Sequence, residues 1–282
     1  MNIKNLINLS IKKLSEDLED DLNGKSFKND ITSNILLKKF KPLSCIISNR
    51  EEIIICGVTF INEFFNRKYP NIKVKSFFKD GDKIKKNSKI FNLSGDAKII
   101  LGVERTILNF VQHLSSISTE THQFVSKIKN KKTQLLNTRK TTTGLRKLEK
   151  YATIVGGALN HRMGLYDDIL IKDNHIKILG GIHKALESLN SKKIKKYKIE
   201  CESFEDVKKS IDMGANYILL DNMNISEIKK CIILKKKRII FEITGGITIN
   251  NISKYSQLGA DYISTGKITN SSNSVDIGLD II

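Results

Sequence analysis

The C-terminal half of the chain alternates short apolar runs with helical segments at a nearly constant spacing. This repeat limits the possible folds more than any other feature. Equivalent places in the pattern recur after 21, 22 and 21 residues, at Glu200, Asp221, Ile243 and Ser264. Strand–helix units of this length, joined by right-handed crossovers, build a parallel sheet that can close into a barrel. An open doubly wound sheet is the alternative, but no G-x-G-x-x-G motif follows any predicted strand.

The predicted strands and helices of this region follow the hydrophobic pattern. The strands are expected at 134–136, 168–171, 197–201, 217–220, 239–243 and 261–264, with helices in the gaps, such as 204–214 and 225–237. A long helix is predicted over 103–128, where Ile107, Leu108, Val111, Leu114 and Ile117 form an apolar stripe. The sequence therefore predicts an α/β barrel as the catalytic domain, over residues 103–270.

The first hundred residues have a mixed α+β character. A helix is expected over 3–22, followed by strands at 44–56 and 72–78 with a helix at 59–68 between them. Tight turns at Asp80-Gly81-Asp82 and Ser94-Gly95-Asp96 separate short strands that end near Leu101. We therefore expect a sandwich-like N-terminal α+β domain over 1–102. The C-terminal tail 271–282 is expected to pack back on this domain.

The strong positive charge has a compositional explanation. The formal net charge is +18, but the 48 basic residues comprise 41 Lys and only 7 Arg, scattered along the chain without interleaved aromatic residues. A bias toward Lys, Asn and Ile is what A/T-rich coding produces. Nucleic-acid binding, which would show steep salt dependence, is the alternative that this pattern disfavours.

Two further classes of protein are disfavoured by the apolar residues and the cysteines. No apolar run approaches the roughly 18 residues that a membrane helix needs, and the first residues lack the apolar core of a cleavable leader. Four cysteines, at 45, 56, 201 and 231, form no C-x-x-C pair. We expect reduced, mostly buried thiols in a cytoplasmic protein without membrane partners. For Cys201, which stands between two glutamates, the alternative is a position lining a site.

Polar residues follow one predicted strand after another, at the edge where a barrel carries its chemistry. The first such segment holds Thr138, Arg139 and Lys140, and later ones hold Lys172, Glu200 and Asp221. Two glycine-containing segments, Thr244-Gly245-Gly246 and Thr265-Gly266-Lys267, suit a phosphate because glycine lets the backbone N–H groups approach closely. Tight turns alone, or a helix cap at Asp221-Asn222, are the alternatives for these segments.

In a chain this rich in lysine, we expect the few arginines at positions where lysine cannot replace them. One such position is a site where the planar guanidinium group binds a carboxylate through two parallel hydrogen bonds. Arg105, Arg139 and Arg162, with the adjacent His161, are candidates, whereas Arg146 suits a helix ion pair with Glu149. A surface histidine is the alternative for His161. Together with Lys172, these cations predict a site for a small dianionic molecule beside a phosphorylated sugar.

Several segments resemble one known family, quinolinate phosphoribosyltransferase, over essentially the whole chain. The resemblance is carried by ERTILNF from 104, NTRKTTTGLRKLEKY from 137, NHRMGLYD from 160, LIKDNHI from 170, IECE from 199, LDNM from 220, EITGGI from 242 and DYISTGKIT from 261. It implies a type II phosphoribosyltransferase fold, with an N-terminal α/β domain and an open α/β barrel.

The resemblance also implies a reaction and a set of site residues. The family is a glycosyltransferase (pentosyltransferase) that joins quinolinate to phosphoribosyl pyrophosphate with Mg²⁺. It releases pyrophosphate and CO₂ and yields nicotinate mononucleotide for NAD synthesis. By this resemblance, quinolinate is bound by Arg139, His161, Arg162, Lys172 and a neighbouring subunit's Arg105, and the 5′-phosphate by Thr244, Gly245, Gly246, Thr265, Gly266 and Lys267. Lys140 and Thr138 are implied to contact phosphate or pyrophosphate. Catalysis is implied for Lys140, Glu200 and Asp221, and Glu200 and Asp221 are also the candidates for contact with Mg²⁺. A homodimer or larger homo-oligomer is expected.

Two positions depart from the family pattern. Thr143 stands before Gly144 where a proline is common, and Asn270 stands where a histidine is common. Neither departure removes a charged site residue. A related enzyme for another pyridine, a metal-transport-associated homologue and an inactive scaffold are the alternatives, and the full set of cations argues for the quinolinate enzyme.

Overall fold

The computed structural model describes residues 2–282, and the chain divides into two compact units. The first unit holds the chain as far as Glu120, together with Leu145–Gly156 and Ser272–Ile282. The second holds Thr121–Gly144 and Gly157–Ser271. The boundary expected between residues 102 and 103 falls inside a single helix, α4 (Ala97–Lys127), whereas the tail expected to pack on the N-terminal domain does belong to the first unit.

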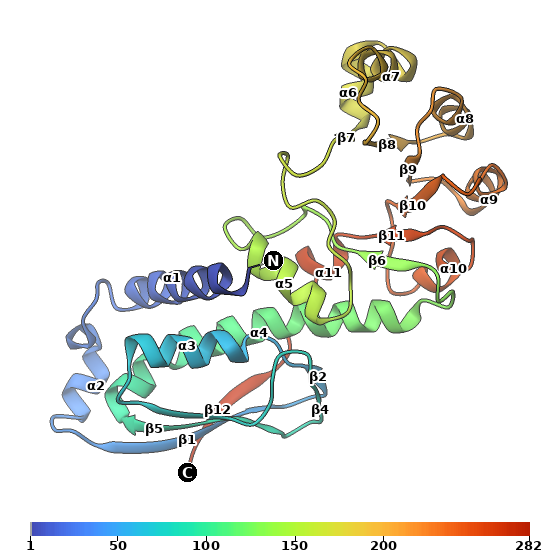
Figure 1. Cartoon of the computed structure of the whole chain (residues 1–282). Helices are drawn as coiled ribbons and strands as arrows, with labels where there is room; N and C mark the ends of the chain where they lie inside the picture. Colours follow the sequence, from blue (N-terminus) through green and yellow to red (C-terminus); the bar gives the residue numbers. More distant parts are fainter. Residues whose placement is uncertain (1) are drawn as a thin grey trace. The chain divides into compact units, whose positions relative to one another are not determined.

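The first unit is a four-stranded antiparallel sheet covered by helices (Figure 1). The sheet has the order β12 (Ile277–Ile281), β1 (Pro42–Asn49), β5 (Lys89–Asp96) and β3 (Lys73–Ser76). The other elements are α1 (Ile3–Asp21), a 3₁₀ turn (Phe27–Asn29), α2 (Ile31–Leu36), α3 (Val58–Lys68), α5 (Arg146–Val155), and a pair of short strands, β2 (Ile53–Ile54) and β4 (Lys83–Ile84). Apolar residues of α1, α3 and α4 form the core against the sheet.

Three local predictions for this unit are wrong. The strand expected over 44–56 is two strands, because β1 ends at Asn49 and β2 pairs with β4 instead of continuing the ladder. The turn expected at Ser94-Gly95-Asp96 lies inside β5, where Ser94 and Gly95 pair with Ser44 and Leu43. Strand structure does not reach Leu101, because α4 begins at Ala97. Asp96 Oδ1 accepts the N–H of Lys98 there, as at many helix starts.

The second unit is a six-stranded parallel sheet of the predicted α/β type. Its order is β6 (Gln134–Leu136), β11 (Tyr262–Ser264), β10 (Ile240–Thr244), β9 (Tyr217–Asp221), β8 (Lys198–Cys201) and β7 (Leu170–Ile171). Beyond β6, a single bridge joins Leu136 to Leu159. Within residues 2–282, no ladder joins β7 to this far edge, so the barrel is open. Helices α6 (Asp173–Leu179), α7 (Ile182–Ser191), α8 (Phe204–Asp212), α9 (Ile225–Ile233), α10 (Ile252–Ser256) and α11 (Lys267–Asn270) fill the connections.

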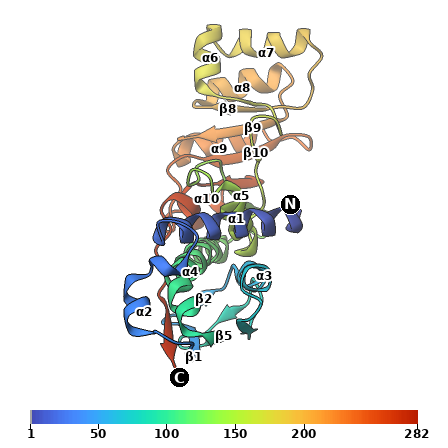
Figure 2. The same ribbon diagram turned by 90° about the vertical axis from the view of Figure 1, so that its left-hand side faces the viewer.

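Alternation along the strands separates an apolar layer from a polar interior. Ile199, Ile218, Phe241 and Ile263 belong to the core shared with the helices, which follow one another beside β8, β9 and β10 in Figures 1 and 2. Their neighbours Glu200, Leu219, Glu242 and Ser264 line a pocket on the other face. Ile243, grouped with Asp221 in the sequence repeat, lies in the core. Thr244 pairs with Asp221 and lines the pocket instead.

The cysteines are buried and free, as predicted. Cys201 does not line the pocket. It lies in the core between strand and helix, with Sγ 3.4 Å from Ser210 Oγ, because it is one residue out of phase with Glu200. In the part of the chain described, no helix combines the length and the apolar character needed to cross a bilayer.

Candidate active site

A cavity of about 560 Å³ lies at the carboxyl ends of the parallel strands, entirely within the second unit. Its walls contain every predicted site residue of that unit, namely Thr138, Arg139, Lys140, His161, Arg162, Lys172, Glu200, Asp221, Thr244, Gly245, Gly246, Thr265, Gly266 and Lys267. Arg105 lies exposed on α4 in the first unit and is not a wall residue. Asn270 also lines the cavity.

One wall concentrates positive charge. Arg139 follows β6, and its buried Nε has no hydrogen-bond partner within residues 2–282. Arg162 donates from Nη1 to the carbonyl oxygen of Asp168 at 3.0 Å. Burial lowers the pKa of Arg162, and the neighbouring positive charge of Arg139 lowers it further. An anion bound beside these two guanidinium groups would stabilise the charged form of Arg162.

The facing carboxylates come from two adjacent strands. Glu200 Oε1 accepts a hydrogen bond from Lys172 Nζ at 2.6 Å, and only 8% of the glutamate side chain is exposed. Burial raises the pKa of Glu200, the hydrogen bond from Lys172 opposes this, and the charge of Asp221 raises it again. Asp221 is the last residue of β9. The pair therefore adds negative charge to the same cavity, and the charge of Glu200 acts on Arg162.

The loop after β10 brings bare backbone to the cavity. Gly245 and Gly246 have φ angles of +81° and +62°, a region that favours glycine. Gly245 packs against Asn222, and a β-carbon at Gly245 would lie 2.7 Å from the Asn222 backbone nitrogen. Asn251 Nδ2 donates to the Gly246 carbonyl at 2.9 Å. This close packing fixes the loop.

The loop after β11 is tied to the segment that carries Lys140. Thr265 Oγ1 donates to the Ile247 carbonyl at 3.0 Å, and Thr269 Oγ1 donates to the Lys140 carbonyl at 2.6 Å. A β-carbon at Gly266 would lie 2.8 Å from Lys140 Cδ, so the two segments are in close contact. Two glycine loops and a lysine thus border one side of the cavity.

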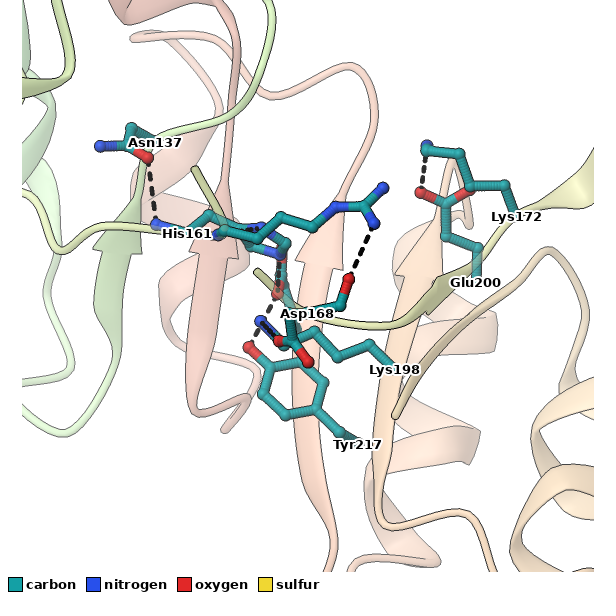
Figure 3. Close-up of polar contacts among 9 residues, drawn as sticks. Asn137, His161, Asp168, Lys172, Lys198, Glu200 and Tyr217 are labelled. Carbon is teal, nitrogen blue, oxygen red and sulfur yellow. Dashed lines mark hydrogen bonds and ion pairs between the residues drawn. The ribbon is translucent and has the colours of Figure 1, made fainter. Parts of the chain in front are cut away.

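Beneath the cations lies a buried polar cluster that the sequence analysis missed (Figure 3). Glu242, fully buried, accepts the Tyr217 hydroxyl at 2.8 Å, and the same carboxylate oxygen lies 3.5 Å from His161 Nε2. Lys198 lies over the Tyr217 ring and contacts the Asp168 carboxylate at 3.1 Å. The available signal was a single glutamate inside the apolar run IIFEI, which is unusual unless that side chain has partners.

Two carboxylates in the cavity are suited to a metal ion. Across residues 2–282, His, Cys, Asp and Glu side chains form no group of three or more suited to a metal ion. Glu200 and Asp221 are both wall residues, and Mg²⁺ is commonly held by one or two carboxylates together with substrate phosphates. The donor set therefore fits a magnesium ion that a phosphate-rich substrate helps to bind.

Comparison with protein-family models gives two matches that together span most of the chain. Residues 30–115 match the model described as "Quinolinate phosphoribosyl transferase, N-terminal domain". Residues 117–280 match "Quinolinate phosphoribosyl transferase, C-terminal domain".

Individual relatives agree with these matches. The chain is 37% identical, over 97% of its length and 97% of the relative's, to a protein named probable nicotinate-nucleotide pyrophosphorylase [carboxylating] from Methanocaldococcus jannaschii. Among solved structures, the nicotinate-nucleotide pyrophosphorylase from Ehrlichia chaffeensis matches with a TM-score of 0.89 and 38% identity, covering 100% of this chain and 99% of that one. The enzyme of the same name from Francisella tularensis has the same TM-score at 34% identity, over 98% and 97% of the two chains.

Proposed function

The chain belongs to the quinolinate phosphoribosyltransferase family, and on that premise we propose that its cavity transfers the phosphoribosyl group of phosphoribosyl pyrophosphate to quinolinate. The reaction releases pyrophosphate and CO₂ and yields nicotinate mononucleotide for NAD biosynthesis. The observation that carries this proposal is the cationic wall, where Arg139 and Arg162 lie close enough for one charge to lower the pKa of the other.

Quinolinate carries two carboxylates on adjacent ring carbons, so it matches a wall with several cations. We assign carboxylate binding to Arg139, Arg162 and Lys172. Each charge-assisted hydrogen bond contributes roughly 1.5–3 kcal/mol. Together such bonds offset the several kcal/mol that immobilising a small ligand costs.

The opposite side of the cavity suits the phosphorylated sugar. The bare backbone of Gly245, Gly246 and Gly266 and the side chains of Thr244, Thr265 and Lys267 would bind the 5′-phosphate. Thr138 and Lys140 would contact the pyrophosphate. Glu200 and Asp221 would then face the ribose between these two anchors.

The arrangement supports the first chemical step by charge and by position. As pyrophosphate departs, positive charge develops at the anomeric carbon, and the Glu200 and Asp221 carboxylates stabilise it. The guanidinium groups bind the carboxylates of quinolinate and so position the pyridine nitrogen, which attacks that carbon. Because both reactants are anchored in one cavity, positioning supplies much of the rate enhancement. Mg²⁺, held by Glu200, Asp221 and the substrate phosphates, would neutralise charge on the leaving pyrophosphate.

The second step needs no separate decarboxylation cofactor. Once the ring nitrogen is bonded to the sugar, it is cationic and accepts the electron pair left when the adjacent carboxylate departs as CO₂. A proton then adds to that ring carbon. The pocket's part is to keep the second carboxylate bound to its cations while the first one leaves.

We further propose that the enzyme is a cytoplasmic homodimer in which the partner subunit completes the cationic wall. Arg105, exposed on α4, is the residue expected to reach the neighbouring cavity. Free, buried cysteines suit a reducing compartment. Mixing and refolding Arg105→Ala with Arg139→Ala would restore part of the lost activity, because one cavity of each mixed dimer keeps both arginines. No recovery from a verified mixed dimer would contradict the shared site.

The activity itself is tested with purified protein, quinolinate, phosphoribosyl pyrophosphate and Mg²⁺, following nicotinate mononucleotide. Nicotinate serves as the control substrate. Arg139→Ala should reduce turnover of quinolinate by at least about tenfold, since one charge-assisted contact is lost. Arg67→Ala, which removes an exposed ion pair with Glu63 in the first unit, is the matched control and should leave turnover unchanged. Equal activity with nicotinate would reject the quinolinate assignment.

A further inference from the structure

His161 and Arg162 are buried, although the segment that carries them has no regular secondary structure. The segment follows the bridge residue Leu159 and precedes β7, and the two side chains are held among other wall residues. A buried backbone N–H needs an acceptor, and here no strand ladder supplies one. Asn137 Oδ1 accepts the N–H of His161 at 3.0 Å, and His161 Nδ1 accepts the N–H of Arg162 at 2.8 Å.

The contact with Arg162 identifies which ring nitrogen carries the proton. A backbone N–H only donates, so Nδ1 must present a lone pair toward Arg162. The ring proton then sits on Nε2, which lies 3.5 Å from Glu242 Oε2. Glu242 is itself fixed, since the same oxygen accepts the Tyr217 hydroxyl at 2.8 Å. Figure 3 shows Tyr217 below His161 at this position.

Each ring nitrogen of His161 therefore faces a protein group. The backbone nitrogen of Arg162 is held by His161, and its guanidinium by the Asp168 carbonyl at 3.0 Å. These two contacts fix both ends of Arg162. A proton on Nδ1 would face the N–H of Arg162, and two donors cannot bond to each other, so the contact between His161 and the Arg162 backbone would be lost.

We propose that His161 is a positioning residue that acts through Arg162, and that Glu242 and Tyr217 select the Nε2–H form of the ring for this purpose. This reassigns the direct carboxylate contact expected of His161. The inference rests on the proposed function only for the identity of the substrate that Arg162 binds.

Two amide substitutions separate the two ring nitrogens. Asparagine places Oδ1 near the position of Nδ1, whereas glutamine places its amide near Nε2. His161→Asn should keep the Michaelis constant for quinolinate within about threefold of the wild-type value, while His161→Gln and His161→Ala should raise it about tenfold or more, the effect of one misplaced charged contact. The Michaelis constant for phosphoribosyl pyrophosphate should stay unchanged in all three. Full function in His161→Gln with loss in His161→Asn would overturn the proposal in favour of direct donation from Nε2.

Glu242→Gln tests how the ring proton is selected. A glutamine amide presents either a donor or an acceptor to Nε2, so it no longer enforces one form. The substitution should raise the Michaelis constant for quinolinate when His161 is present and have little further effect in His161→Asn. Equal effects in both backgrounds would mean that Glu242 acts only on stability, and would overturn its assigned role.

A spectroscopic measurement on the unsubstituted protein needs no turnover, and a variant is used only to assign the signal. Nitrogen-15 shifts of the histidine rings distinguish a bare nitrogen from a protonated one, and the His161 signal is assigned by its absence in His161→Asn. We expect a bare Nδ1 and a protonated Nε2 near neutral pH. A proton on Nδ1 would overturn the inference. Failure to convert quinolinate, with the expected shifts intact, would count against the proposed function alone.

Discussion

Replacing Gly245 by alanine tests whether the loop after β10 depends on close packing as well as on its backbone conformation. Gly245 and Gly246 both have φ in the left-handed region, at +81° and +62°. Their surroundings differ: a β-carbon at Gly245 would lie 2.7 Å from the Asn222 nitrogen, whereas one at Gly246 meets no atom within 4 Å. Gly246→Ala is therefore a matched control that carries the conformational cost alone.

The expected magnitudes follow from these two costs. A left-handed conformation costs an ordinary residue about 1–2 kcal/mol, and both variants should lose roughly that much unfolding free energy. Crowding against a neighbour that cannot move adds about 1–3 kcal/mol in Gly245→Ala. Asn222 cannot move freely, because its N–H donates to the Thr244 carbonyl at 3.0 Å and its own φ is +53°.

The measurement is urea unfolding followed by circular dichroism, combined with the Michaelis constant for phosphoribosyl pyrophosphate. Gly245→Ala should shift the urea midpoint further than Gly246→Ala and should also weaken binding of the phosphorylated sugar. Equal midpoint shifts would refute the packing argument. A larger shift in Gly246→Ala would refute the assigned conformational roles as well.

Three other predictions address single side chains. Activity should fall as the pH drops through the raised pKa of Glu200, because that carboxylate acts when it is ionised. Lys172→Met removes the hydrogen bond that lowers the pKa of Glu200, so the pH–rate profile of this variant should show the fall at a higher pH. Burial disfavours the Glu242 carboxylate, but the contacts from His161, Ser264 and Tyr217 outweigh burial and lower its pKa below the ordinary value of 4.5. The ionised carboxylate therefore stabilises the fold at pH values above 4.5, and this stability is lost as the pH falls through the lowered pKa. Urea midpoints measured across that range should depend less on pH in Glu242→Gln. Cys201→Ala should leave turnover within about twofold and cost about 1 kcal/mol of unfolding free energy, since Sγ lies in the core, and a large loss of turnover would contradict that placement.

The sequence predicted the parts of the fold that depend on periodic burial. The parallel strands and their polar carboxyl ends follow from alternation and from a regular βα length, so the sequence could predict that Arg139, Glu200 and Asp221 lie together, as they do around one cavity. Errors arose where tertiary contacts outweigh local pattern. Ser94-Gly95-Asp96 has turn composition but pairs with β1, and Ile243 belongs to the core because register, not spacing, sets which side chain faces inward.

The missed part of the site has the same physical origin. Glu242, Tyr217, Lys198 and Asp168 are distributed over four separate segments, and only the side-by-side packing of these segments in the folded sheet brings them together. A lone charge in an apolar strand signals that partners exist, but it does not identify them. Contacts such as Arg162 N–H to His161 Nδ1 also depend on irregular backbone, which has no periodic signature.

The interleaving of the two units has a consequence for synthesis on the ribosome. The first unit draws on the chain up to Glu120 but also on Leu145–Gly156 and Ser272–Ile282, and β12 pairs with β1 over residues 277–281. A nascent chain that has emerged as far as residue 120 therefore holds β1 with one edge open, a template for unwanted pairing.

That edge closes only after residues 277–281 have left the ribosome. The usual order, in which an N-terminal domain folds while the rest is made, does not apply to this sheet. A stop codon placed before β12 would leave intact the sequence of the catalytic cavity and still expose β1. We expect such truncated chains to be lost to aggregation or degradation, so that the amount of protein falls before any change in catalytic activity can be measured.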